Sequence, residues 1–380
     1  MAVCRYCGSC SGIRQCAGIV PFGLYDVKDL TSMLFAWPQL RRRRRSSGAR
    51  LESWLRVFKI ASAFGAARFR QADVALFHEF EPPPGGGGHQ FLRALWREFA
   101  HRGLRVESNS LSRTTQACLF NSFNFDPARL RCFYRAGCRM VHRVDGPIAV
   151  YRGWDDGSDR RIWRLNQQFA DVTVFQSQYS LAKHAELGLE FTAPCVIMNA
   201  ADPRLFHPRG RMPFDRRRKV RLISTSWSDN PNKGAAIYRW LEQHLDWDRF
   251  EYTFVGQARI PFERIRALAP VPSEQLAVLL RQHDIYITAS RNDPCSNALI
   301  EAQACGLPAL YLDSGGHPEI VGAAGLSFSR PEELPERLAR LVEQYEALQA
   351  QISVPTLAES AARYLAVMGI EPSSGTALNT

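Results

Sequence analysis

The chain has 380 residues, of which 46% are hydrophobic and 22% are charged, and its formal net charge is +11. This length allows roughly two to three domains of about 150 residues each, and the composition is that of a globular chain with large cores. No apolar run approaches the roughly 18–20 residues that a membrane-spanning helix needs, and the first residues lack a clean signal-peptide pattern. We therefore expect a cytoplasmic protein.

Residues 1–70 form a basic extension, rich in Cys and Arg, that we expect to be poorly ordered. They hold thirteen Lys or Arg against three acids, so the rest of the chain is close to neutral. The Arg block at 41–50 repels itself and is typical of a solvated segment. Contact with anionic lipid headgroups is an alternative, and it would make the protein membrane-associated. Nucleic acid is not favoured, because no pattern of stacking aromatics accompanies the block.

Four cysteines fall early in the sequence, at Cys4, Cys7, Cys10 and Cys16. The first three have the C-x-x-C-x-x-C spacing of an iron–sulfur or zinc loop. The fourth lies outside this spacing and no second ligand cluster supports it, so we expect free thiols and no bound metal. The other six cysteines stand singly, in contexts that indicate small buried hydrophobes or loop residues.

Regular structure is expected to begin near Gln71. Residues 72–80 are typical of a buried strand, 81–88 of a Pro- and Gly-rich turn, and 89–106 of a helix with one apolar face that leads into another strand. Short apolar strands alternate with helices from there to about residue 200. Such alternation predicts a parallel, doubly wound sheet, and we assign 71–200 to one Rossmann-like domain.

Residues 201–216 are rich in Pro, Arg and Asp, and we expect them to link two domains. Beyond them the alternation restarts and predicts a second doubly wound domain over 217–345. Residues 346–380 are expected to form a C-terminal helix and tail. The predicted fold class is α/β, with two doubly wound domains that face each other across a cleft.

In open parallel sheets ligands bind at the carboxyl ends of the strands, so the turns there are the candidate sites. The run Gly85, Gly86, Gly87 and Gly88 would let backbone N–H groups approach a ligand or an opposing loop, although a plain turn is the alternative. Lys233 follows a turn and precedes a helix, where its charge adds to the positive helix end. An arriving diphosphate would resolve this repulsion, and a solvated lysine is the alternative.

Asp293 and Glu301 are eight residues apart, in a turn and in the helix that follows it. The helix would place Glu301 one or two turns deep while Asp293 stays at the mouth of the cleft. Carboxylates at these places suit the vicinal hydroxyls of a sugar or a ribose. Between them, Ser296, Asn297 and Ala298 offer N–H groups at a helix start, which could hold an anion. The alternative is a capping residue between two solvated acids.

Residues 72–340 resemble the retaining, nucleotide-sugar-dependent glycosyltransferases of the large group 1 family, which adopt the two-domain GT-B fold. The family's Glu-x7-Glu signature and its Ala-rich helix correspond here to Asp293-x7-Glu301 and EAQACGLP. SGGHPEIVG at 314–322 takes the place of the Gly-Gly-x-x-Glu-Ile-Val turn. The segment IMNAADPRLFHP is similar to the family's interdomain segment.

This resemblance implies transfer of a sugar from a nucleoside-diphosphate sugar to a carbohydrate or lipid-linked acceptor, with retention and without a metal or other cofactor. It implies that Glu301 binds the ribose, Asp293 contacts the donor sugar and Lys233 neutralises the diphosphate. On the donor side, Gly315 and Gly316 would join these residues. In the first domain, His142 would face the donor sugar. The run Gly85–Gly88 and Asp145 would approach the phosphates or the acceptor.

Two positions depart from the family pattern. The first acid is Asp293, one methylene shorter than glutamate, and the Arg that usually precedes the lysine is missing, with Trp227 and Ser228 near its place. These departures favour an alternative in which the protein binds nucleotide sugars without catalysis. An epimerase or a phosphorylase, which can share the same two-domain architecture, is a further alternative.

Overall fold

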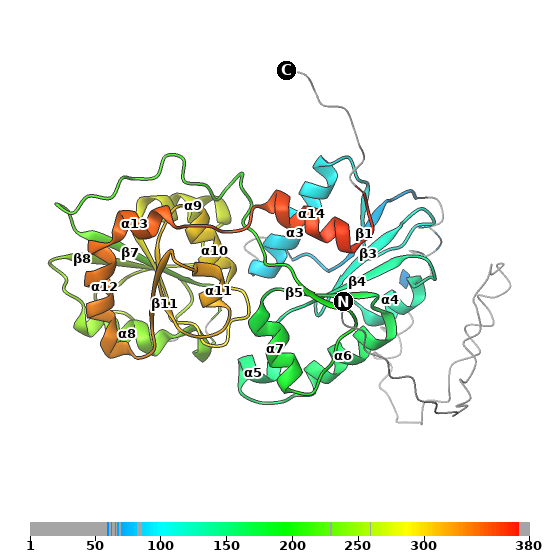
Figure 1. Cartoon of the computed structure of the whole chain (residues 1–380), viewed down its shortest axis with the longest axis horizontal. Coiled ribbons are helices and arrows are strands. Elements are labelled where there is room, and N and C mark those ends of the chain that lie inside the picture. The colour runs from blue at the N-terminus through cyan, green and yellow to red at the C-terminus, as the bar shows by residue number, and fades with distance from the viewer. Residues whose placement is uncertain are drawn as a thin grey trace, which may run out of the picture. The chain divides into compact units, whose positions relative to one another are not determined.

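The computed structural model describes residues 59–371, apart from 61, 63–64, 66, 68–69, 82–85, 229 and 259 (Figure 1). The described residues belong to one compact unit, Val57–Thr380. Most of the basic extension, its four early cysteines and Gly85 lie outside the described residues, so the expected disorder and the lipid contact of this extension stay predictions. No helix of the described part is long and apolar enough to cross a bilayer.

The first half of the described chain is a six-stranded, wholly parallel sheet with the order β2-β1-β3-β4-β5-β6. Its strands are β1 (Val74–Phe77), β2 (Val106–Ser108), β3 (Ala117–Asn121), β4 (Arg139–Val144), β5 (Val172–Phe175) and β6 (Pro194–Val196). The helices of this half are α3 (Gly87–His101), α4 (Pro127–Phe133), α5 (Ile148–Arg152), α6 (Ser158–Phe169) and α7 (Gln178–Glu186).

Both faces of this sheet are covered, which explains why its strands are continuous apolar runs. In β1, Val74 and Leu76 join one core while Ala75 and Phe77 join the core on the opposite face. Helix α3 lies on the first of these faces and buries its apolar stripe there. The crossover from β1 through this helix to β2 is the predicted strand–turn–helix–strand unit.

The second half is another six-stranded parallel sheet, with the order β12-β11-β10-β7-β8-β9. Its strands are β7 (Val220–Ser226), β8 (Phe250–Gly256), β9 (Arg266–Leu268), β10 (Ile285–Thr288), β11 (Ala309–Leu312) and β12 (Gly325–Phe328). Its helical segments are η1 (Pro231–Lys233), α8 (Ala235–His244), α9 (Ser273–Gln282), α10 (Asn297–Ala304), α11 (His317–Val321), η2 (Pro331–Glu333) and α12 (Leu334–Glu343). The strand order reverses between β7 and β10, and doubly wound sheets bind ligands at such a switch point.

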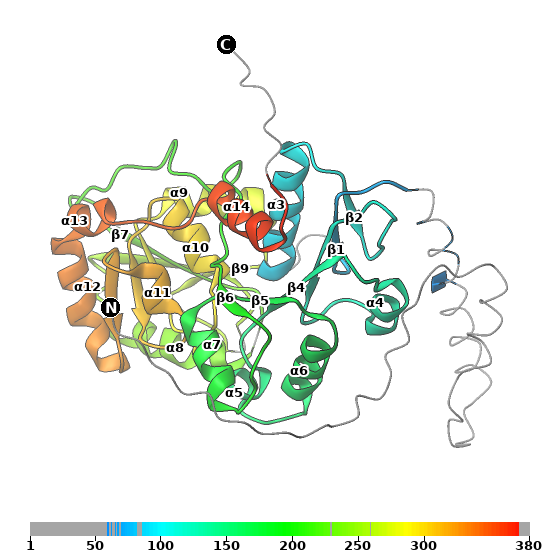
Figure 2. The same ribbon diagram turned by 45° about the vertical axis from the view of Figure 1, so that its right-hand side comes forward.

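The chain ends by returning to the first half. After α13 (Tyr345–Ala350), α14 (Leu357–Val367) packs against α3, and both views show these two helices side by side (Figures 1 and 2). Leu357, Ala361 and Tyr364 enter the core of the first sheet. A capping box formed by Thr356 and Glu359 starts this helix. The strands of the two sheets fall within the predicted ranges 71–200 and 217–345, and the domain boundaries themselves stay predictions.

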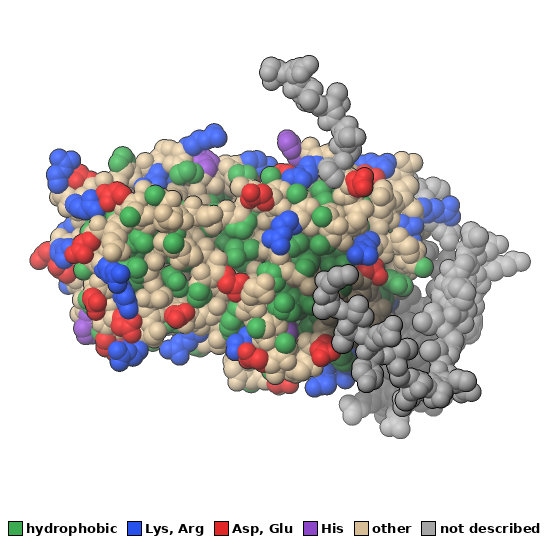
Figure 3. Space-filling model, viewed as in Figure 1, with side chains coloured by type: hydrophobic (Ala, Val, Ile, Leu, Met, Phe, Trp, Pro, Cys, Tyr) green, Lys and Arg blue, Asp and Glu red, His purple; other side chains and the backbone are tan. Residues whose placement is uncertain are grey.

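Charged side chains of both signs are interspersed on the face of the molecule that Figure 3 shows. This agrees with a chain whose excess positive charge is concentrated in residues 1–70. Charges that bind a ligand in the described part are therefore expected as single side chains at the strand ends.

Candidate active site

Lys233 and Asp293 meet at the switch point of the second sheet. Lys233 follows β7 and Asp293 follows β10, and the lysine Nζ donates to the carboxylate Oδ2 over 2.9 Å. Burial alone would raise the pKa of Asp293, but the charges of Lys233 and His317 and the hydrogen bonds to the carboxylate together outweigh it, so this pKa is lowered. Burial likewise opposes the charge of Lys233, but Asp293 raises its pKa. Both groups are therefore ionised at neutral pH.

The loop that carries Lys233 is shaped by its neighbours in the sequence. Asn230 Oδ1 accepts from the N–H of Asn232 over 2.9 Å and starts the short helix η1. Gly234 follows in the left-handed region, with a φ of 83°. A Cβ at this position would overlap the backbone carbonyl of Ala289. Glycine is thus required for the loop after β7 to lie against the end of β10, and this contact brings the lysine to Asp293.

The Gly315–Gly316 turn supports Asp293 from behind. The N–H of Gly316 donates to the Asp293 carbonyl over 2.9 Å. Gly315 has a φ of 67°, and a Cβ there would overlap the same carbonyl. The predicted donor-binding glycines are therefore placed where they also fix the backbone of Asp293, and their contact with the donor stays a prediction.

Glu301 lies one turn into α10 and is partly buried. No side-chain hydrogen bond or ion pair holds its carboxyl group among the described residues. Burial raises the pKa of this group to about 8, so the free protein carries it largely protonated at neutral pH. A carboxyl whose pKa is strongly shifted by its surroundings is a common sign of a functional site. Ligand hydroxyls that donate to it would favour its ionised form.

The N-termini of α3 and α10 lie against each other. A Cβ at Gly87, the first residue of α3, would be 2.6 Å from Asn297 Nδ2, at the first residue of α10. Ser296 occupies the N-cap position of α10 without a side-chain capping bond, and Ala298 packs partly against the core. Two positive helix ends with Lys233 nearby in the same turn region suit an anion.

His142 does not join this group, which corrects the prediction that it faces the donor sugar. It lies within β4, is fully buried, and its ring stacks on Phe120 with the centroids 4.3 Å apart. Its Nδ1 lies 3.1 Å from Asn166 Nδ2, and burial lowers its pKa to about 3. Asp145, the first residue after β4, is the charged group at this strand end, where it accepts from Arg143 over 3.1 Å.

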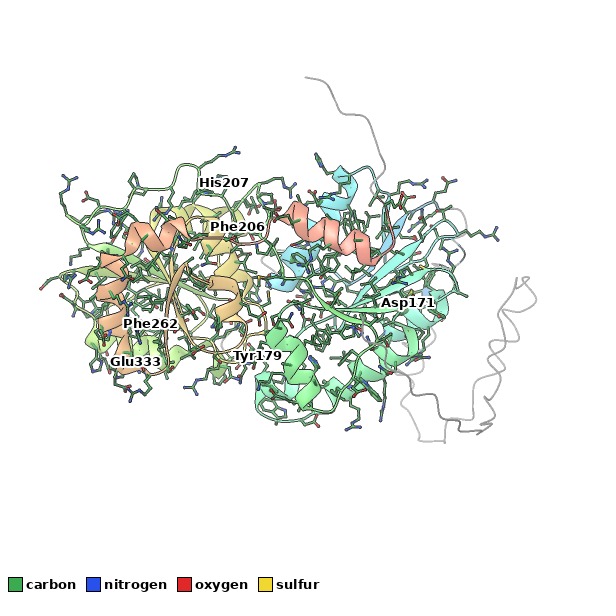
Figure 4. All side chains as sticks on the ribbon, viewed as in Figure 1. Asp171, Tyr179, Phe206, His207, Phe262 and Glu333 are labelled. Atoms are coloured by element: carbon green, nitrogen blue, oxygen red, sulfur yellow. The ribbon has the colours of Figure 1, made fainter. Side chains whose placement is uncertain are left out.

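Several residues at the site were not predicted. The ring of Tyr151 lies 5.7 Å from Lys233 Nζ, and the Tyr151 carbonyl accepts from Asn232 Nδ2. Glu319 of α11 accepts from two backbone N–H groups at the start of α7, where Figure 4 labels Tyr179. Glu319 stands in the quoted SGGHPEIVG turn, which was a usable signal, whereas nothing in the sequence marks Tyr151.

The architecture is the GT-B fold. Sucrose-phosphate synthase from Thermosynechococcus elongatus superposes with a TM-score of 0.59, at 14% sequence identity, over 79% of this chain and 95% of that one. HepE of Anabaena in complex with UDP and glucose gives 0.56 at 17% identity, over 78% and 95%. Starch synthase IV from Arabidopsis thaliana, bound to ADP and acarbose, gives 0.60 at 11% identity, over 79% and 99%.

Residues 243–344 match the family described as glycosyl transferases group 1. In sequence, the chain is 37% identical over 82 residues to the D-inositol 3-phosphate glycosyltransferase of Corynebacterium jeikeium. It is 29% identical over 85 residues to the phosphatidylinositol N-acetylglucosaminyltransferase gpi3 subunit of Schizosaccharomyces pombe. The matched segments span about a fifth of each relative. The expected fold and the expected resemblance to GT-B glycosyltransferases of group 1 are confirmed.

Proposed function

We propose that the protein transfers a sugar from a nucleoside-diphosphate sugar to a hydroxyl of a carbohydrate or lipid-linked acceptor, with retention at the anomeric carbon. The observation that carries this proposal is the convergence of Lys233, the N-termini of α3 and α10, and the carboxyl of Glu301 near one switch point. This carboxyl has no side-chain partner among the residues that the structure describes. Three positive features would receive a diphosphate, and the carboxyl would receive hydroxyls.

Each group then has a defined task. Lys233 and the two helix ends stabilise the diphosphate as the bond between its oxygen and the anomeric carbon breaks. Glu301 accepts hydrogen bonds from the ribose hydroxyls. Asp293, already held by Lys233, contacts the donor sugar at the mouth of the site. The acceptor oxygen forms the new bond from the face that the diphosphate leaves, and its proton passes to the departing phosphate oxygen.

The relatives indicate which donor to test first. HepE is described with UDP and glucose, and both sequence relatives are named as transferases of sugars to inositol-containing molecules. UDP-glucose and UDP-N-acetylglucosamine are therefore the first donors, followed by ADP and GDP sugars.

The test follows release of nucleoside diphosphate by the purified chain from this panel, with a Glu301→Ala control. Release from one donor that depends on an acceptor, and is lost in the control, supports the proposal. NMR of the product anomer tests retention. Change of the donor alone would indicate an epimerase, and dependence on inorganic phosphate a phosphorylase. Binding without turnover for every acceptor would indicate a non-catalytic protein.

A further inference from the structure

Four polar side chains form a closed ring at the carboxyl edge of the first sheet. Arg143, in β4, donates to Asp145 Oδ1 over 3.1 Å and to Asn199 Oδ1 over 3.0 Å. Gln176, which follows β5, donates to the same Asp145 oxygen and accepts from Asn199 Nδ2 over 2.9 Å. Each side chain thus binds two others, and the ring ties together the ends of β4 and β5 and the segment after β6.

Asn199 connects this ring to the second half of the chain. Its Nδ2 also donates to Asn297 Oδ1 over 3.0 Å, and Asn297 is the first residue of α10. Asn199 is fully buried, and its amide uses its oxygen for Arg143 and its nitrogen for Gln176 and Asn297. An amide with these three bonds has one orientation that satisfies all of them, since O and N exchange roles on a flip.

The ring surrounds the charge of Arg143, and a ring that only stabilised the fold would not need a buried charge. Arg143 is fully buried, and its guanidinium is held by the ring, by Asn121 Oδ1 at 2.9 Å and by the face of Phe91, 5.3 Å away. A buried ion costs several kcal/mol of desolvation, and well-packed apolar residues often replace such an ion without loss of stability. In some other systems buried polar groups of this kind fix one geometry.

We propose that Asn199 is a positioning residue that holds the N-terminus of α10 in register with the carboxyl edge of the first sheet. Gly87 lies against the side chain of Asn297, so the same contact sets how the N-termini of α3 and α10 meet. A shift of Asn297 would move the α10 N–H groups away from the diphosphate that both helix ends address. This inference rests on the proposed donor site.

A double-mutant cycle with Asn199→Ala and Asn297→Ala tests the inference. Affinity for UDP, or for whichever nucleoside diphosphate the wild type binds, is measured by calorimetry, together with KM for the donor and for the acceptor. We expect each single variant to weaken the affinity about tenfold, and the double variant to be no weaker than either, because the two changes remove one contact. KM for the donor should rise while KM for the acceptor stays unchanged.

Asn121→Ala is the matched control, since it removes another buried bond to Arg143 without touching the second half. It should lower the thermal midpoint, as Asn199→Ala does, but keep nucleotide affinity within about twofold. Should Asn199→Ala fail to fold, Asn199→Asp serves instead. It keeps an acceptor for Arg143 and lacks the donor for Asn297, so it too should weaken the affinity about tenfold.

Wild-type affinity in Asn199→Ala, or losses that multiply in the double variant, would overturn the positioning role. If the wild type binds no nucleoside diphosphate, the proposed function fails by itself. The double-mutant cycle is then measured as the free energy of unfolding. Additive effects of the two substitutions would contradict the contact between Asn199 and Asn297.

Discussion

Lys233 and Asp293 form an ion pair, so removing one charge should destabilise the protein by leaving the other charge without its partner. Lys233→Met leaves a buried carboxylate without its partner, and we expect a loss of about 1–3 kcal/mol in the free energy of unfolding. Adding Asp293→Asn removes that uncompensated charge and should recover most of the loss. Urea denaturation of the two variants measures the difference. Nucleotide binding should be weak in both, because neither has the lysine.

Glu301 should make the stability of the protein depend on pH. Its pKa is raised from 4.5 to about 8, so between these values the folded chain holds a proton that the unfolded chain has released. The stabilising contribution is therefore complete below pH 4.5 and is lost as the pH rises through about 8. Glu301→Gln stays neutral and should show a shallower fall in the free energy of unfolding between pH 5 and 8. Parallel curves for the two proteins would contradict the raised pKa.

Some positions of the candidate site residues can be predicted from sequence patterns, and others cannot. The places of Lys233 and Asp293, which the structure brings together, could be predicted because strand ends followed by turns have recognisable sequences. The place of Glu301 could be predicted from the helix that follows, and the roles of all three residues stay predictions. The position of His142 could not be judged, because a strand buried on both faces gives no alternation to show where it ends. Structure places the end at Val144, so that Asp145 lies at the edge and His142 in the core.

At the scale of elements, the contact between α3 and α10 should make two neighbouring glycines respond differently to substitution. A Cβ at Gly87 would strike Asn297, whereas a Cβ at Gly88 would have no neighbour within 4 Å. Gly87→Ala should push the two helix ends apart and weaken nucleotide binding about tenfold. Gly88→Ala should leave binding unchanged and stabilise the chain by about 0.4–1 kcal/mol, since glycine is costly within a helix. Equal affinities in both variants would show that the helix ends do not share a ligand.

Most longer elements were predictable, and several of the shorter ones were not. Buried strands such as β1 and β10 are apolar runs between turns, and α3 has a clear apolar stripe. Strands β6 and β9 have three residues each, too few for any period to be visible. The helical segment from Leu334 onward also breaks at Gln344 into α12 and α13, although no Gly or Pro marks that position. The packing of α14 on α3 depends on contacts distant in sequence, which periodicity does not contain.

At the scale of the whole described chain, several polar contacts join the two halves near the site. Asn292 Nδ2 donates to the carbonyl of Val150 over 3.3 Å, and the hydroxyl of Tyr179 donates to Asn292 Oδ1 over 3.0 Å. Such bonds exchange readily with water or ligand atoms, unlike the apolar packing inside each half. The halves are thus joined near the site by contacts that substrate can replace, which suits the proposed transfer, because its site has to admit a donor and then exclude water.

Glu319 makes a charged contact between the two halves near the site. Its two carboxylate oxygens accept from the N–H groups of Gln178 and Tyr179, each over 2.7 Å, at the positive end of α7. Glu319→Ala should release these amides, and we expect both to exchange hydrogen for deuterium at least tenfold faster, with a comparable fall in kcat/KM. Glu319→Gln keeps an acceptor oxygen but loses the charge, so it should fall between the alanine variant and the wild type.

Ser177→Ala is the matched control for this experiment. The hydroxyl of Ser177 caps the same helix by accepting from the N–H of Ser180 over 3.0 Å, within the first half of the chain. The substitution should speed exchange at Ser180 and leave kcat/KM near the wild-type value, because the contact with Glu319 remains. If it lowers kcat/KM as much as Glu319→Ala does, fraying of α7 explains both results and the link between the halves has no part in turnover. If only the glutamate variant loses activity, that link is needed for the reaction.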